Sequence, residues 1–382
     1  MTFLPRLRTA LCWALAGAAL VGVGSLAAQR VPIRRLGPPL AVLSHEFSLV
    51  NSLRELSGDR VLVTDFIDNV VLLADLGADR VTPFGRIGDG PGEYRQVFPL
   101  LPMGRDTTLM GNAIARRWLM ITRDTTLRTL APGTDLTRKL QDVAALLGFD
   151  ERGNMLGIRM RPRTTADDVE LPIHTVLVSL RGSQEDTIDT RTKAFRRLGS
   201  PSDPPVAYVL TTDDEAVIAP DGWIALVRHA PYRVDWRAPD GRTSRGRAVD
   251  EPAVPVDERE KASYRARLAS QTTPLTRRRP GTASGSSTPP RGTTIWPDII
   301  PPFDGVGAVL PARGGRILVR RTPTASRPEP RYDLFSATRG REFQLVLAPN
   351  QRIQATGTRG LYVVTTDDDG IERISVHPWP TP

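Results

Sequence analysis

A turn-and-strand unit recurs six times along this 382-residue chain, and internal repetition constrains the fold more strongly than any single motif. Each unit begins with a tight turn that contains glycine. A short apolar run rich in β-branched residues follows at once, which is the pattern of a buried strand. The turns contain Gly58, Gly104, Gly153, Gly222, Gly314 and Gly360. A second apolar run and a further turn follow in most units, so each unit is predicted to be a four-stranded meander.

The spacing of these turns predicts the architecture. Most steps between successive turn glycines are close to the roughly 40 to 50 residues of propeller blades. The steps that end at Gly222 and Gly314 are longer, so the third and fourth units are expected to carry insertions. Six meanders of this size predict an all-β fold, a six-bladed β-propeller, that occupies residues 41–382 as one domain.

Closure of the ring needs a strand from elsewhere in the chain. The sixth unit has no residues for a fourth strand after its third apolar run, Ile371–Val376. An unpaired sheet edge is a site of unwanted association, and propellers protect their edges. The segment Ala41–Phe47 has the length and alternation of a strand and precedes the first turn. We predict that this N-terminal strand completes the last blade.

The largest insertion is expected at residues 250–303. Asp257 stands three residues before Glu260 as a candidate helix N-cap, and Lys261–Ala269 continues with alanines at near-helical spacing. A short helix is therefore predicted. The following segment, Ser270–Gly292, has almost no apolar residue to bury and is expected to be disordered.

One stretch of the chain allows two interpretations. Residues Asp135–Phe149 place Leu136, Leu140 and Leu147 at helical spacing, yet the same segment could end as the inner strand of the third blade. We assign Val143–Phe149 to the strand and leave its beginning open.

The first residues have the pattern of an export signal. A short basic segment with Arg6 and Arg8 precedes the apolar stretch Thr9–Leu26, and Ser25–Gln29 offers small residues for cleavage. We expect residues 1–28 to be a signal peptide and the mature protein to be periplasmic or extracellular. The alternative is a retained anchor, because the stretch is long enough to span a bilayer.

Composition excludes several classes of function. Among 51 basic residues only Lys139, Lys193 and Lys261 are lysine, and the formal net charge is +9. The arginines are scattered among 42 acidic residues rather than interleaved with aromatics, so we expect no nucleic-acid binding. The single cysteine, Cys12, lies within the leader and leaves the mature chain without a disulfide. We expect a monomer with no membrane contact after cleavage.

No standard catalytic signature is present. The chain has no G-x-S-x-G, H-E-x-x-H, Walker loop or cysteine pair, and its four histidines lack metal-ligand spacing. We therefore assign no catalytic residue, no metal ligand and no cofactor.

The most specific local sequence is Phe84–Tyr94, which reads F-G-R-I-G-D-G-P-G-E-Y. This segment resembles the one that links the first two blades in secreted bacterial six-bladed propellers, a group similar to the NHL-repeat and TolB-like propellers. Further similarities lie at Pro231–Trp236, Trp296–Phe303 and Leu361–Gly370. The resemblance implies the fold and export, and it adds no catalytic residue.

The glycine-rich loop has two interpretations. In the structural one, its glycines allow positive φ and a tight path between blades, with Glu93 accepting hydrogen bonds from loop amides. In the functional one, successive amides bind an anion, or Asp89 and Glu93 hold calcium. A dinucleotide site is disfavoured, because Pro91 and Pro99 leave no room for the helix that would receive the pyrophosphate.

The loops between second and third strands are expected to surround the mouth of the central channel, where a ligand commonly binds. Arginine is the commonest residue in these loops. We predict that this face binds a polar or anionic ligand, such as an acidic glycan or a carboxylate, or a cell-envelope protein. The predicted binding residues are Asp89, Glu93, Arg116, Arg117, Arg228 and His229.

The sequence is also compatible with two functions other than a binding scaffold. The first is a calcium-dependent lactonase-like hydrolase, in which Asp68, Asp89 and Asp367 would hold the ion in the channel. The second is a purely structural module of the cell envelope without a small ligand.

Overall fold

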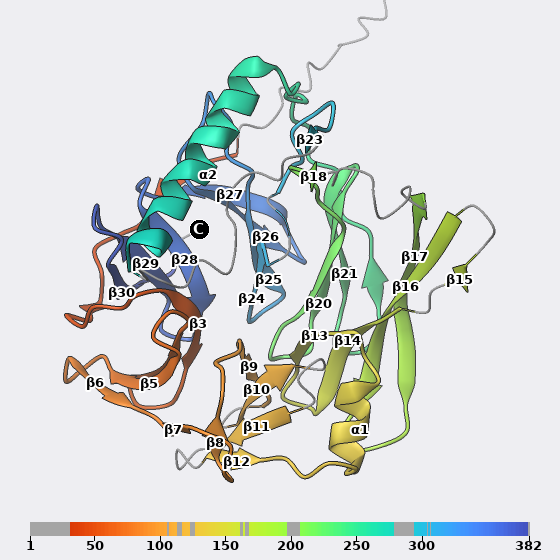
Figure 1. Cartoon of the computed structure of the whole chain (residues 1–382). Helices are drawn as coiled ribbons and strands as arrows, with labels where there is room; N and C mark the ends of the chain where they lie inside the picture. The colour runs from red at the N-terminus through yellow and green to blue at the C-terminus, as the bar shows by residue number, and fades with distance from the viewer. Residues whose placement is uncertain are drawn as a thin grey trace, which may run out of the picture. The chain divides into compact units, whose positions relative to one another are not determined.

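Six sheets of mainly antiparallel strands follow one another around a ring in the computed structural model of this chain (Figure 1). The structure describes residues 31–104, 107–112, 117–122, 127–160, 163–164, 168–196, 207–278, 294–303, 305 and 307–380. The predicted signal peptide lies outside these residues. The expected all-β fold with six blades is confirmed.

The first three blades contain these strands, from the channel outward. Blade 1 consists of β3 (Val50–Glu55), β4 (Arg60–Asp65), β5 (Val70–Asp75) and β6 (Arg80–Pro83). Blade 2 consists of β9 (Leu100–Pro102), β10 (Thr108–Asn112), β11 (Arg117–Ile121) and β12 (Leu127–Thr129). Blade 3 consists of β13 (Ala145–Phe149), β14 (Asn154–Met160), β16 (Asp168–Ser179) and β17 (Glu185–Arg196), with β15 (Arg163–Thr164) beside β16.

The last three blades follow the same order. Blade 4 consists of β19 (Glu215–Ile218), β20 (Ile224–His229), β21 (Tyr232–Arg237) and β22 (Thr243–Ser244). Blade 5 consists of β24 (Val309–Ala312), β25 (Arg316–Arg320), β26 (Arg331–Ser336), β27 (Gly340–Val346) and, outermost, β1 (Ile33–Arg35). Blade 6 consists of β28 (Gln351–Thr356), β29 (Leu361–Thr366), β30 (Glu372–His377) and β2 (Ala41–Val42).

The hydrophobic core is divided among the gaps between blades. Each of six clusters of buried apolar side chains joins two consecutive blades, and one of them joins blade 6 to blade 1. The inner strands also contact their neighbours all the way round, including β28 with β3. Alternation along a strand explains this arrangement, because successive side chains point to opposite faces of the sheet and so to opposite neighbouring blades.

The predicted closure by the N-terminal segment is confirmed. Strand β2 pairs antiparallel with β30, and the amide of Phe47 donates to the carbonyl of Glu372 at 2.9 Å. Leu43 and Phe47 are fully buried in the cluster between blades 6 and 1. The parallel pairing of β1 with β27 in blade 5 was not foreseen.

A charged contact locks the same junction. The Glu372 carboxylate accepts the amide of Val50 at 2.7 Å and the guanidinium of Arg352 at 2.6 Å. Arg352 also donates to the carbonyl of Val50 at 3.0 Å. Blade 6 is therefore joined to the inner strand of blade 1 by side chains as well as by the shared core.

The ambiguous stretch and the large insertion each contain a helix. Helix α1 (Asp135–Gln141) is capped by Thr134 and leads directly into β13, so the helical and strand interpretations each hold for one part of the stretch. Helix α2 (Glu258–Arg278) runs beyond the expected end at Ala269. The described part of the segment expected to be disordered, up to Arg278, continues this helix. The rest of that predicted segment lies outside the described residues.

Helix α2 is anchored to blade 5. The Asp257 carboxylate accepts the amide of Glu260 at 2.9 Å, as predicted for the N-cap. The buried carboxylate of Glu260 in turn accepts the amide of Ala325 at 2.8 Å. Nearby, β18 (Ala207–Tyr208) pairs with β23 (Thr294–Ile295). Within the described part of the chain, no helix has the length and apolar character needed to cross a membrane.

Candidate functional site

The glycine-rich loop is organised around Glu93. Two short parallel strands, β7 (Arg86–Ile87) and β8 (Glu93–Tyr94), form its base. The Glu93 carboxylate accepts the amide of Gly90 at 2.8 Å and pairs with Arg86 at 2.9 Å. The expected hydrogen bond from a loop amide to Glu93 is therefore present. This carboxylate holds the loop in shape.

Asp89 lies between two arginines beside this loop. Arg95 forms a forked contact with its carboxylate, with Nη2 2.6 Å from Oδ2, and Arg117 Nη1 lies 3.4 Å from Oδ1. Arg117 Nη2 also donates to the carbonyls of Gly90, at 3.0 Å, and Glu93, at 2.9 Å. The hydrogen bond from Arg95 is the main factor that lowers the pKa of Asp89, so this carboxyl is ionised at neutral pH.

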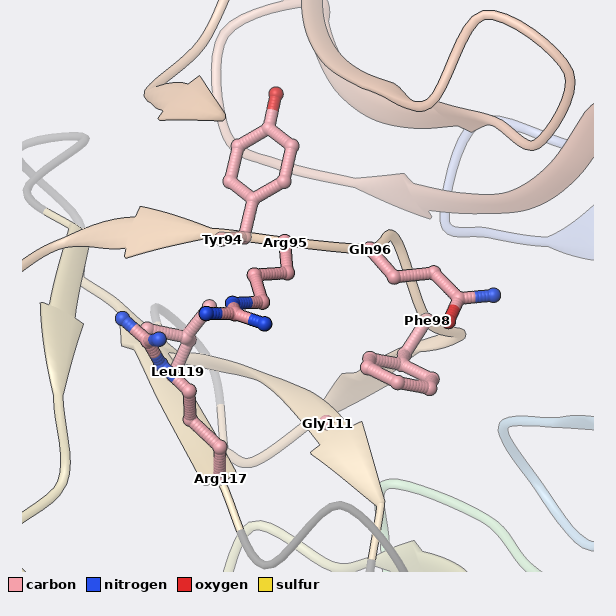
Figure 2. A pocket seen from close by; sticks show the side chains of 7 residues that line it. All are labelled: Tyr94, Arg95, Gln96, Phe98, Gly111, Arg117 and Leu119. Atoms are coloured by element: carbon pink, nitrogen blue, oxygen red, sulfur yellow. The ribbon is translucent and has the colours of Figure 1, made fainter. Parts of the chain in front are cut away.

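A pocket of about 240 Å³ opens beside the two arginines. We call it the loop pocket, and its lining residues are Tyr94, Arg95, Gln96, Phe98, Gly111, Arg117 and Leu119. Figure 2 shows Arg95 and Arg117 reaching one side of the pocket from two segments of the chain, with Phe98 and Gln96 on the other side. The pocket therefore combines two cations with an apolar wall.

Arg228 and His229 belong to a second charged cluster, between blades 3 and 4. The Arg228 guanidinium contacts Asp189 at 2.8 Å, Asp214 at 2.9 Å and Asp235 at 3.2 Å. These partners raise the pKa of Arg228, with the hydrogen bond to Asp189 as the largest cause. Asp214 also accepts the backbone amide of His229 at 3.0 Å and lies 2.6 Å from its Nδ1.

The structure thus separates the predicted binding residues into two groups. Asp89, Glu93 and Arg117 meet at the glycine-rich loop, whereas Arg228 and His229 lie in another blade junction. Arg116 lies outside the described residues. Both described arginines of the prediction have acidic partners within the chain, which sequence spacing could not reveal. Arg95 was missed, although its position directly after the loop was a usable signal.

The acids considered for calcium are engaged by separate local partners. Asp68 accepts the Ser48 hydroxyl at 2.8 Å, and Asp367 accepts the amide of Ile371 at 2.8 Å and pairs with Arg373 at 3.1 Å. Across the described residues, no group of three or more histidine, cysteine, aspartate or glutamate side chains is arranged to hold a metal ion. The described geometry thus gives the calcium hypothesis no support.

Glu215 is a titratable group that sequence reasoning missed. It begins β19, the inner strand of blade 4, and burial raises its pKa to about 7 in spite of nearby amides from Gly307 to Val309. Within the described part of the protein, its buried Oε1 has no hydrogen-bond partner. The desolvated carboxyl is therefore close to half-protonated near neutral pH. Nothing in the sequence around it marks this position.

The fold places the chain in the class of six-bladed β-propellers, and comparison with known proteins goes little further. No family model matches the chain, and no curated protein matches it. Solved structures with similarity include a candidate exported protein of Bacteroides fragilis, with 9% identity over 91% of this chain and 99% of that one and a TM-score of 0.46.

Two further solved structures are similar at the same low level. Regucalcin of Agrobacterium tumefaciens, a calcium-binding protein, has 12% identity over 92% of this chain and 99% of its own, with a TM-score of 0.34. Virginiamycin B lyase of Staphylococcus aureus has 8% identity over 87% and 98%, with a TM-score of 0.38. These values carry no argument about ligand or activity, so the architecture rests on the strand pairing of the protein itself.

Proposed function

We propose that this protein is an exported propeller scaffold, akin to the NHL-repeat group, that binds an anionic ligand in the loop pocket. The supporting observation is the convergence of Arg95 and Arg117 on a single carboxylate, that of Asp89, at the edge of this pocket. Two guanidinium groups around one carboxylate are the arrangement with which proteins recognise carboxylates and other oxyanions.

Asp89 occupies the position that a ligand carboxylate would take. Its side chain is 59% exposed, so an incoming anion can displace it without unfolding the loop. Phe98 and Leu119 then provide apolar contacts for the body of the ligand, and Gln96 adds an amide. An acidic glycan or another organic carboxylate combines these features.

The proposed export of the protein would give it access to extracytoplasmic ligands. The basic segment, apolar stretch and small-residue end of residues 1–28 are those of a signal peptide, so we propose a periplasmic or extracellular protein. Acidic glycans and cell-envelope proteins are present in these compartments.

Calorimetric titration of the mature protein with trigalacturonate tests the loop pocket. The double variant R95Q/R117Q is expected to bind at least tenfold more weakly, because it loses both charge-assisted contacts. Asp89→Asn is expected to bind several-fold more tightly, since it removes the internal competitor for the same two arginines.

Arg80 supplies the matched control, because it is an exposed arginine of the neighbouring blade 1 that does not line the pocket. The variant R80Q is expected to bind trigalacturonate like the wild type. Equal affinity of R80Q and R95Q/R117Q would contradict the proposal.

A further inference from the structure

A second pocket, of about 280 Å³, lies between blades 3 and 4, where its lining residue Asp235 contacts Arg228 at 3.2 Å. We call it the rim pocket. Its walls come from β20, β21 and β22 of blade 4 and from Ile188 on β17 of blade 3. Strand β22 contains only Thr243 and Ser244, and both side chains are exposed. The short outer strand leaves this part of the blade open to solvent.

Two arginines of β21 line the rim pocket and are already neutralised. Arg233 donates through Nε and Nη2 to Asp235, at 2.9 and 3.1 Å, and Arg237 donates through Nη2 to Asp186. Each guanidinium keeps further N–H groups that point to no partner within the described residues. Because their charges are balanced by acids, these two arginines offer hydrogen bonds rather than net charge.

Arg245 is different, because its charge is not balanced. It follows β22 directly, is exposed and lines the same pocket. In the described parts of the chain it forms neither an ion pair nor a side-chain hydrogen bond. The rim pocket therefore holds one uncompensated positive charge beside two arginines and one aspartate, Asp235, that are already paired. It is matched by a ligand with a single negative charge.

The remaining walls define the body of that ligand. Ile188 and Leu226 pack at the edge of the core between blades 3 and 4, so they present apolar surface to the pocket. Thr243 and Ser244, which are exposed, add two hydroxyl groups to the lining. A sugar ring matches both kinds of lining, with C–H groups on its face and hydroxyls at its edge.

We propose that the rim pocket binds an acidic sugar residue, with its one anionic group, a carboxylate or a sulfate ester, on Arg245. The ring packs on Ile188 and Leu226, and its hydroxyls bond to Ser244 and to the spare N–H groups of Arg237. This site is independent of the loop pocket, because the two pockets share no residue and belong to different blade pairs.

Titration by NMR of the mature protein with glucuronate, glucose 6-sulfate and glucose tests this inference. The wild type is expected to bind at least one of the two acidic sugars and to bind glucose at least tenfold more weakly. Arg245→Gln is expected to lower the affinity for the acidic sugar at least tenfold. The double variant T243A/S244A, which keeps the charge, is expected to lower it several-fold.

Arg242 is the matched control. It is also an exposed arginine of this strand region, but its side chain pairs with Asp240 at 2.7 Å and does not line the pocket. Followed at the amide signals of Thr243 and Ser244, which line only the rim pocket, Arg242→Gln and R95Q/R117Q are both expected to bind the acidic sugar like the wild type, which separates this site from the loop pocket. Unchanged affinity in Arg245→Gln, an equal loss in Arg242→Gln, or equal binding of glucose would overturn the inference.

Discussion

At the scale of single residues, Glu215 makes the stability of the protein depend on pH. Its pKa rises from the ordinary 4.5 to about 7 on folding, so the folded state favours the neutral carboxyl. Its contribution to stability is therefore complete below about pH 4.5 and is lost as the pH rises through about 7. The difference corresponds to roughly 3 kcal/mol, because one pKa unit is worth about 1.4 kcal/mol.

We expect Glu215→Gln to remove this loss. Urea unfolding at pH 5 and pH 8 should show a smaller difference in free energy of unfolding for the variant than for the wild type. Glu329→Gln, at an exposed glutamate of blade 5, is the control and should keep the wild-type difference. If Glu215→Gln shows the same difference in free energy of unfolding between pH 5 and pH 8 as the wild type, Glu215 does not titrate as described.

The site residues show how far sequence reasoning reaches at this scale. Asp89, Glu93 and Arg117, which the sequence analysis grouped with Arg228 and His229, lie in contact because the glycine-rich loop and the start of β11 follow one another in the order of the blades. The partners of Arg228 could not be found in this way. Asp189 lies on an outer strand and Asp214 before an inner one, and only the packing of blade 3 on blade 4 brings them together.

At the scale of elements, the conformation of the glycine-rich loop requires glycine for two reasons: a positive φ and the close approach of the neighbouring backbone at Leu127. Gly92 has a φ of +74°, and a Cβ at this position would lie 2.6 Å from the carbonyl oxygen of Leu127. Gly58, in the first blade turn, has a φ of +69° and open space around it. The two glycines therefore differ in steric surroundings but share a left-handed conformation.

This difference predicts unequal costs of substitution. Gly58→Ala should destabilise the protein by about 1 kcal/mol, the cost of a left-handed alanine. Gly92→Ala adds a clash with rigid backbone and should cost roughly 3 kcal/mol in all. Chemical unfolding of both variants measures these free energies. Equal losses would show that the loop can move away from Leu127.

The elements that the sequence predicted best are those that follow the turn glycines. Strands β4, β20, β25 and β29 begin close to the expected positions, because a tight turn and a β-branched run mark each of them locally. Strand β17, which runs from Glu185 to Arg196, is harder to predict. Its polar residues gave no strand signal, since long pairing with β16 rather than burial extends it.

At the scale of the whole molecule, stability depends on the closure between the first and last blades. Deletion of residues 31–48 removes β1, β2 and the fully buried Leu43 and Phe47. We expect the deletion variant to lose the cooperative unfolding transition of the intact protein. Leu43→Ala, a milder change, should keep the transition and lower the free energy of unfolding by roughly 2 to 5 kcal/mol.

Calorimetry and urea unfolding measure both effects. Val42→Ala, at the half-exposed position directly before Leu43, is the control and should change stability by less than Leu43→Ala. If the deletion variant unfolds with the cooperativity of the full mature chain, closure by residues 31–48 is not needed for cooperative unfolding.

The pairing of β2 with β30 also determines when the protein can reach its native state in the cell. Strand β2 is translated early and β30 late. Strand β2 therefore cannot pair with β30 until most of the polypeptide has been synthesised. If the chain is exported as proposed, it must remain unfolded during translocation and close the ring afterwards. A chaperone that binds the unpaired β2 before β30 is available would speed folding without contacting either proposed pocket.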